Sequence, residues 1–318
     1  MKANSRFLSA SCAMVLAAMA SAAWATPFEP TVETVASPDP GTVNTHIVFA
    51  RDGVILIDAQ RVSSEAARVI SRVSESRLAV LAIVVTHAHP DHYGGLAELH
   101  RAYPDAPIIA SAATAAAIRG DEGGYIAKAA ARLGRDFGSA VPAPDRLVVD
   151  RETIVLGGEA FRFDELGEGE ASAMTVVVMP WRHLLFAGDL VTNGVTPFVV
   201  EGRSTAWQKQ LAAAEDAYVD VERIYPGHGP SQGGTDLFSR QERYLQDLRD
   251  AVQANAVDGR LTAAAKAKVV ATMKTAYPAD KSSVQAGDLL ELNADAVADE
   301  LRRVTAARGA SLREAQTN

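Results

Sequence analysis

Three of the seven histidines in this 318-residue chain fall within six consecutive positions. Together with an aspartate they form the segment His87-Ala88-His89-Pro90-Asp91-His92. Imidazole nitrogens and carboxylate oxygens are side-chain atoms that bind Zn²⁺ and similar divalent ions. His87 and His89 lie two residues apart, so on an extended loop they point the same way and can chelate one ion. Asp91 and His92 can then turn toward a second ion. The segment therefore predicts a metal centre, in preference to a loop of surface histidines.

The segment directly follows eight apolar residues, 78–85, which predict a strand buried on both faces. Layered α/β proteins place their ligands at this carboxyl end of such strands. Residues 43–58 predict two short strands around an Asp-Gly turn. An amphipathic helix is then indicated by apolar residues at helical spacing, namely Ala66, Val69, Ile70 and Val73. Strand, helix and buried strand make a βαβ unit, which indicates an α/β fold.

The remainder of the chain alternates in a similar way. Residues 108–110 predict a short strand, and the alanine-rich residues 111–135 predict helix. Helix is expected again at about 204–217, then a strand ending near Tyr225, and helices from Asp236 onward. Between these parts, short β segments are expected at residues 146–149, 153–156, 160–163, 174–179 and 183–187. Two halves, each with a β layer and helices outside it, predict a four-layer αββα sandwich.

Composition excludes several classes of protein. The chain has 31 Lys and Arg against 39 Asp and Glu, and this net charge of −8 argues against a nucleic acid as its main partner. Its single cysteine excludes a disulfide framework and a cysteine-rich zinc module. Histidines and carboxylates are then the available metal ligands, and a small molecule is the expected partner.

The first 25 residues have the pattern of a secretory leader. Lys2 and Arg6 precede an uncharged run that ends in Ala23-Trp24-Ala25, a small-x-small site for cleavage after Ala25. An uncleaved membrane anchor is the alternative, but the run is weakly apolar. We therefore expect a periplasmic or secreted protein with no stable membrane insertion after cleavage. The predicted organisation is a signal peptide (1–25), a main domain that contains the metal-binding segment (26–250) and a C-terminal helical extension packed on it (251–318).

The metal-binding segment matches H-x-H-x-D-H, and here the chain resembles the metallo-β-lactamase superfamily of di-metal hydrolases. Further motifs follow in the order of that family: VILID ending in Asp58, FAGD ending in Asp189, and YPGHG containing His228. The resemblance implies that Asp58 orients the metal-binding loop from behind. It also implies that Asp189 bridges two ions and that His228 completes the second site with Asp91 and His92. The αββα sandwich is the fold that the resemblance implies.

One position departs from the family pattern. Where a histidine usually completes the first site with His87 and His89, this chain has Glu170, 19 residues before Asp189. A carboxylate can also bind Zn²⁺, so we expect Glu170 to be a ligand, with Glu168 as the alternative. A further alternative is that the first site binds metal weakly and the enzyme works with one ion. An oxygen ligand in place of a nitrogen makes the site a harder, more anionic ligand set, so Mn²⁺ and Fe²⁺ are alternatives to the expected Zn²⁺.

The resemblance implies a hydrolase in which water activated by two divalent ions cleaves its substrate, with Asp91 orienting the water or transferring a proton. We expect a small ester, lactone or thioester. β-Lactamases usually have Cys or Ser where this chain has Asp189, so a β-lactam is the second choice. A metal-binding or sensor module without catalysis is the alternative of another class.

The roles of the other candidates are less specific. Tyr93 could reach the substrate or pack in the core, and structural roles are the default for His46, His100 and His183. Segments 111–140 and 192–198 are the candidates for framing the substrate. The helices after residue 250 could form a lid, a dimer face or simple packing, and the oligomeric state is open.

Overall fold

A computed structural model describes residues 28–38, 43–137, 140–282 and 288–317, with side chains in the last helix described to residue 307. The expected leader lies outside these residues, so its cleavage after Ala25 stays a prediction. No helix in the described ranges is both long enough and apolar enough to cross a membrane.

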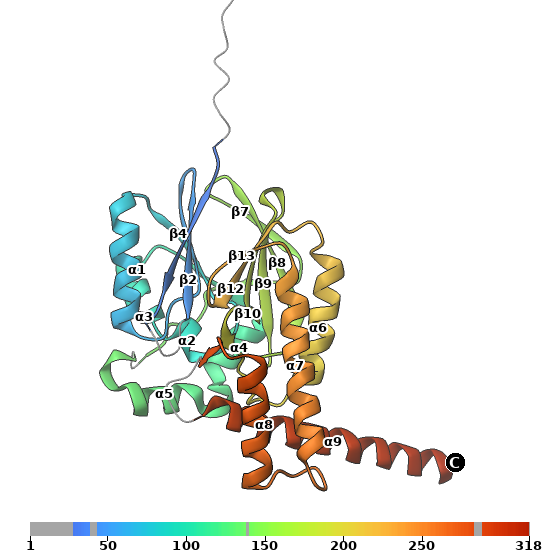
Figure 1. Ribbon diagram of the computed structural model, residues 1–318. Coiled ribbons are helices and arrows are strands. Elements are labelled where there is room, and N and C mark those ends of the chain that lie inside the picture. The colour runs from blue at the N-terminus through green and yellow to red at the C-terminus, as the bar shows by residue number, and fades with distance from the viewer. Residues whose placement is uncertain (1–27, 39–42, 138–139, 283–287, 318) are drawn as a thin grey trace, which may run out of the picture.

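Two six-stranded sheets form the centre of the molecule (Figure 1). The first has its strands in sequence order: β1 (Thr31–Ala36), β2 (Asn44–Ala50), β3 (Gly53–Ile57), β4 (Val80–Val84), β5 (Ile108–Ser111) and β6 (Arg146–Val148). The second is ordered β13 (Gln232–Gly233), β12 (Arg223–His228), β10 (Leu184–Thr192), β9 (Met174–Met179), β8 (Glu159–Gly167) and β7 (Glu152–Leu156). A two-stranded ribbon pairs β11 (Val195–Thr196) with β14 (Lys281–Ser282).

Helices cover the outer face of each sheet, as Figure 1 shows for α1 on one side and α6 and α7 on the other. The first half of the chain contributes α1 (Ser63–Ser76), α2 (Pro90–Tyr93), α3 (Leu96–Ala102), α4 (Ala112–Gly120) and α5 (Tyr125–Leu133). The second half contributes α6 (Ser204–Ala217), α7 (Asp236–Asn255), α8 (Ala263–Ala276) and α9 (Leu289–Thr317).

Three apolar clusters hold these layers together. The first lies between the sheets, where Ile55 and Val84 meet Phe163 and Phe186. A second joins the outer face of the first sheet to α1, α3 and α4. The third joins the outer face of the second sheet to α6, α7, α8 and α9. Because each sheet buries one face against the other sheet and one against helices, the molecule has four layers in the order αββα, as predicted from the sequence.

Two details differ from the sequence prediction. The helix expected at 111–135 is divided into α4 and α5, because Gly123 and Gly124 adopt φ angles of +73° and +66°, which end a helix. The sequence does not predict strand β1. It is the edge strand of its sheet, its six residues are exposed or only partly buried, and they show no clear alternation of buried and exposed positions.

Candidate metal centre

The candidate ligands of the metal-binding segment follow the end of β4: His87 and His89 lie on a loop, and Asp91 and His92 lie in the short helix α2 that follows it. His87 forms an isolated bridge to Met174 of the second sheet, so the loop reaches across to the other half of the sandwich. His87 and His92 are fully buried, and His89 is 5% exposed. The loop is therefore fixed by both sheets before any ligand is considered.

Asp58, at the end of β3, supports this loop from behind. Its Oδ1 atom accepts a hydrogen bond from the Thr86 backbone N–H at 2.9 Å, and its Oδ2 atom lies 2.8 Å from Nδ1 of His92. A histidine ring that donates one nitrogen to a carboxylate has its other nitrogen oriented for a metal. The contacts of Asp58 thus leave Nε2 of His92 facing into the centre.

The first group of candidate ligands consists of His87, His89 and Glu170. Glu170 Oε1 lies 2.9 Å from His89 Nδ1, and Glu170 Oε2 lies 3.5 Å from His87 Nε2. The Glu170 carboxyl is 2% exposed, and burial raises its pKa to about 7 even though the charge of His89 acts in the opposite direction. Such a carboxylate is costly to bury unless a cation neutralises it.

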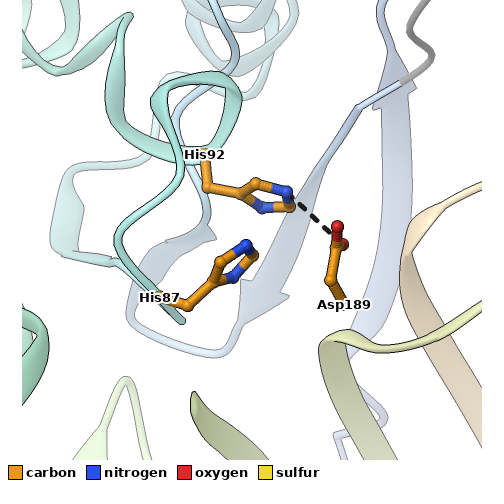
Figure 2. Close-up of side chains that lie close together, drawn as sticks. All are labelled: His87, His92 and Asp189. Atoms are coloured by element: carbon orange, nitrogen blue, oxygen red, sulfur yellow. Dashed lines mark ion pairs between the residues drawn. The ribbon is translucent and has the colours of Figure 1, made fainter. Parts of the chain in front are cut away.

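The second group consists of Asp91, His92 and His228. His228 Nε2 lies 3.3 Å from Asp91 Oδ2 and 3.2 Å from Asp189 Oδ2. Asp189 also forms a group with His87 and His92, and Figure 2 shows both rings directed toward its carboxylate. The distance from His92 Nε2 to Asp189 Oδ1 is 3.4 Å. Asp189 therefore lies between the two groups.

Several buried polar atoms in this centre have no hydrogen-bond partner. They are Nε2 of His87, Nε2 of His92, both carboxylate oxygens of Glu170 and Oδ1 of Asp189. Buried polar atoms are almost always paired, so a cluster of unpaired nitrogen and oxygen atoms needs an explanation. Burial together with the neighbouring charge of His92 holds the pKa of His87 well below its usual value, which gives the neutral ring that ligates metals. This donor set fits divalent metal ions.

Glycines bring the two motifs of the second sheet into contact. Gly188 in β10 pairs with Pro226 in β12 and has a φ angle of +49°, which a residue with a side chain rarely adopts. A Cβ atom at Gly227 would lie 2.0 Å from Oδ1 of Asp189. The glycines before Asp189 and His228 thus permit the close approach of two strands that each carry a candidate ligand.

The two alternatives for the first site are separated by the structure. The Glu168 side chain is 67% exposed, and its Oε2 lies 3.7 Å from Nε of Arg203, away from the histidines. Glu170, not Glu168, is the carboxylate that the fold brings to His87 and His89. Its role as a ligand remains a proposal.

Tyr93 is a buried residue. Its side chain is 1% exposed and packs in the apolar cluster beneath α1 and α3. Among the described residues, those lining the cavity at the centre do not include it. The structure thus agrees with the packing alternative, and the substrate contact stays a prediction.

Two of the remaining histidines, His46 and His183, contact backbone or side-chain atoms outside the metal centre. His46 is buried between Thr34 and the Pro226 carbonyl, each 2.9 Å from a ring nitrogen, and burial lowers its pKa to about 4. His183 is an exposed residue whose Nδ1 lies 2.9 Å from the Asp220 carbonyl oxygen.

Sequence reasoning missed several residues at the centre. Glu201, between β11 and α6, has Oε1 3.0 Å from Nε2 of His89 and accepts a 2.7 Å hydrogen bond from the Tyr125 hydroxyl. The ring of Phe198 lies 5.2 Å from that of His89. Phe198 and Tyr125 fall in the two segments expected to frame the substrate, but no motif distinguished these residues or Glu201 from their neighbours.

The family model of the metallo-beta-lactamase superfamily matches residues 38–228, which is more than half of the chain. The chain belongs to the metallo-beta-lactamase superfamily. With the clustered metal-binding residues, this membership and the relatives below identify it as a metal-dependent hydrolase.

Relatives with two different names match the superfamily part of the chain. Metallo-beta-lactamase type 2 of Bacteroides fragilis is 26% identical over 206 residues, covering 64% of this chain and 74% of that protein. Hydroxyacylglutathione hydrolase of Chromohalobacter salexigens is 26% identical over 179 residues, covering 56% of this chain and 58% of that protein. The solved metallo-beta-lactamase from Pontibacter korlensis shares the fold, with a TM-score of 0.55 and 22% identity over 69% of this chain and 98% of that one.

Proposed function

We propose that this superfamily member hydrolyses a small ester, lactone or thioester with two divalent metal ions. The observation that carries the proposal is the set of buried, unpaired ligand atoms beside an open cavity. The cavity is lined by His89, Asp91, Glu170, Asp189 and His228. A substrate in this cavity would contact the metal centre directly.

The ligand assignment follows the two groups. We assign His87, His89 and Glu170 to one ion, and Asp91, His92 and His228 to the other, with Asp189 shared. Bound divalent ions would polarise the scissile carbonyl and lower the pKa of a water molecule to near 7. We propose Zn²⁺, with Mn²⁺ or Fe²⁺ as alternatives because of the additional carboxylate.

We propose that Asp91 orients the attacking water. Burial alone would raise the pKa of its carboxyl, but the positive charges of His92 and His228 outweigh burial and hold the pKa well below its usual range. With metal bound, His92 and His228 would be neutral ligands and the ion would supply the positive charge that keeps Asp91 ionised, so its carboxylate could accept a hydrogen bond from water. Because it also lines the cavity, that water would face the substrate.

A β-lactam is the second candidate substrate, supported by the match to the Bacteroides fragilis metallo-beta-lactamase. The similarity to hydroxyacylglutathione hydrolases supports the ester and thioester class instead. β-Lactamases usually have Cys or Ser where this chain has Asp189, and this difference also favours the ester and thioester class. A module without catalysis is disfavoured because both Asp91 and Asp189 are present.

The test is a substrate panel combined with metal analysis. Purified protein loaded with Zn²⁺, Mn²⁺ or Fe²⁺ would be assayed on matched small esters, lactones, thioesters and β-lactams. We expect turnover of an oxygen ester or thioester that is lost with a chelator and in His89→Ala. The matched control is His183→Ala, which removes an exposed histidine outside the centre. Absence of metal-dependent turnover across the panel would contradict the proposal, and preferential turnover of β-lactams would select the second candidate.

Export is a separate part of the proposal. The basic, uncharged and small-residue parts of the first 25 residues support a periplasmic or secreted location. A small-molecule partner, rather than a nucleic acid, is supported by the net charge of −8.

A further inference from the structure

Cationic side chains surround the cavity at the metal centre of this acidic protein. Arg61, Lys128 and Arg132 line it together with the candidate ligands. We refer to these three residues as the cationic rim. Three carboxylates, those of Asp91, Glu170 and Asp189, line the same cavity, so the three cations equal them in number although the chain as a whole has a net charge of −8.

Helix α5 supplies two of the three cations from a single face. Its cavity-lining residues are Tyr125, Lys128, Ala129, Arg132 and Leu133. These positions follow the spacing i, i+3, i+4, i+7, i+8, which places them on one stripe of the helix. A stripe with this spacing is usually apolar and faces a core. Here the stripe carries two cations and faces an open cavity, as expected for a surface that binds a ligand.

The two α5 cations of the rim, Lys128 and Arg132, form no ion pair with a carboxylate in the part of the chain that the structure describes. Nζ of Lys128 donates to the Gly123 carbonyl at 2.9 Å and lies 5.5 Å from the centre of the Tyr125 ring. Among the side chains that the structure describes, no carboxylate lies within 4.0 Å of the charged nitrogens of Lys128 or Arg132. Arg61 lies deeper in the cavity, where its guanidinium is 4.0 Å from Asp91. Lys128 and Arg132 therefore retain positive charge that a ligand could pair with.

The carboxylates at the base of the cavity would not cancel this charge in the metal-loaded enzyme. Asp91, Glu170 and Asp189 are the ones we assign to metal ions, and the charge of bound ions would offset theirs. Apolar surface from Leu133 and Phe198 lies in the same cavity. A ligand with an apolar middle and an anionic end would thus match the cavity from centre to rim.

We propose that the natural substrate carries a carboxylate away from its scissile carbonyl, and that Arg132 and Lys128 bind this carboxylate. This inference rests on the proposed hydrolase function and specifies its substrate class. Guanidinium and ammonium groups form charge-assisted hydrogen bonds with carboxylates, so the rim selects substrates by charge and holds the scissile bond toward the metal centre.

The first experiment compares two substrates that differ in one charge. A thioester of glutaric acid with a free distal carboxylate and its neutral distal carboxamide would be assayed with the metal-loaded protein. We expect kcat/KM for the carboxylate to exceed that for the amide by about tenfold or more. The preference should fall with ionic strength, since partly exposed charges are screened by salt.

Variants then assign the preference to α5. Arg132→Gln and Lys128→Gln should each raise KM for the carboxylate substrate by a larger factor than KM for the amide, whereas Arg132→Lys should retain part of the preference. The matched control is Arg119→Gln, an exposed arginine on α4 that does not line the cavity. Circular dichroism would establish that each variant is folded. Equal kcat/KM for the two substrates, or a preference unaffected in the double variant, would overturn the proposal.

A binding measurement separates this inference from the proposed function. If neither thioester is hydrolysed, the hydrolase proposal fails on that class, but the rim can still be tested by calorimetry with free glutarate. We expect the wild-type protein to bind glutarate at least about tenfold more tightly than the Lys128→Gln/Arg132→Gln double variant at the same metal content. Equal binding by the two proteins would refute the rim as a carboxylate site.

Discussion

At the scale of single residues, His89 is constrained on both of its ring nitrogens. Nδ1 faces Glu170 at 2.9 Å, and Nε2 faces Glu201 at 3.0 Å. Glu201 is itself held by the Tyr125 hydroxyl and by an ion pair with Arg203. A carboxylate that accepts the proton of one ring nitrogen fixes the tautomer and leaves the other nitrogen as the metal ligand. Glu201 is thus a positioning residue for His89.

This contact predicts an effect of Glu201 on metal affinity. Glu201→Ala removes the acceptor for His89, and we expect the affinity of the first site to fall about 10- to 100-fold, measured by competition with a chromophoric chelator. Glu201→Gln keeps an oxygen acceptor and should lose less. The matched control is Glu215→Ala, an exposed glutamate on α6. Unchanged metal affinity in Glu201→Ala would show that His89 needs no support from this side.

Glu170 allows a second test, because Glu168 serves as its control. If Glu170 is a ligand, Glu170→Ala should lower the metal content by about one ion per chain in elemental analysis. Glu168→Ala should leave the content unchanged, since that side chain is largely exposed and near Arg203. The opposite pattern would move the ligand role to Glu168, and no change in either variant would exclude both.

At the scale of secondary-structure elements, α9 anchors the loop that carries Phe198 and Glu201. Asn293 accepts a 2.8 Å hydrogen bond from the Val199 N–H and donates one of 2.8 Å to the Pro197 carbonyl. Two turns further along α9, Glu300 accepts hydrogen bonds from the backbone N–H groups of Ser204 and Thr205 at 2.9 and 2.8 Å. Helix α9 therefore fixes both ends of a loop that contacts His89.

The Glu300 contact predicts a loss of stability. Its carboxylate lies at the amino-terminal end of α6, where free N–H groups and the helix dipole favour negative charge. Glu300→Ala should lower the free energy of unfolding by about 2–3 kcal/mol in urea titrations, because buried N–H and hydroxyl donors lose their acceptor. The control is Glu291→Ala, an exposed residue of the same helix, which should change stability by less than about 0.5 kcal/mol. Equal effects of the two substitutions would contradict the anchoring role.

At the scale of the whole molecule, the sequence predicts the layers and most of the metal centre. Hydrophobic periodicity is local, so it indicated the buried strand before His87 and the helices around the sheets. Asp58, Asp189 and His228 were expected at this centre because their motifs resemble those of the metallo-β-lactamase superfamily, not because of periodicity. The structure brings all of them to one centre.

The unpredicted part consists of contacts between segments that are far apart in the chain. Glu201 meets His89 across 112 positions and Tyr125 across 76. Nothing in the residues near Glu201 indicates such a partner, because the contact depends on how the sheets and α5 are arranged. The C-terminal helices are a similar case: residues of α8 and α9, such as Met273 and Val297, share one apolar cluster with the second sheet. A division at residue 250 stays a prediction, and simple packing describes these residues.

The anchoring by α9 also sets a time order for assembly during synthesis. Asn293 follows Val199 by 94 positions, and Glu300 follows Ser204 by 96. At a translation rate of about 5–20 residues per second, these anchors emerge roughly 5–20 s after the loop they hold. During that interval the segments that carry the candidate ligands have been made, whereas the two α9 side chains that hold the loop of Glu201 have not. The loop beside His89 therefore gains its contacts with α9 only after the last helix has been made.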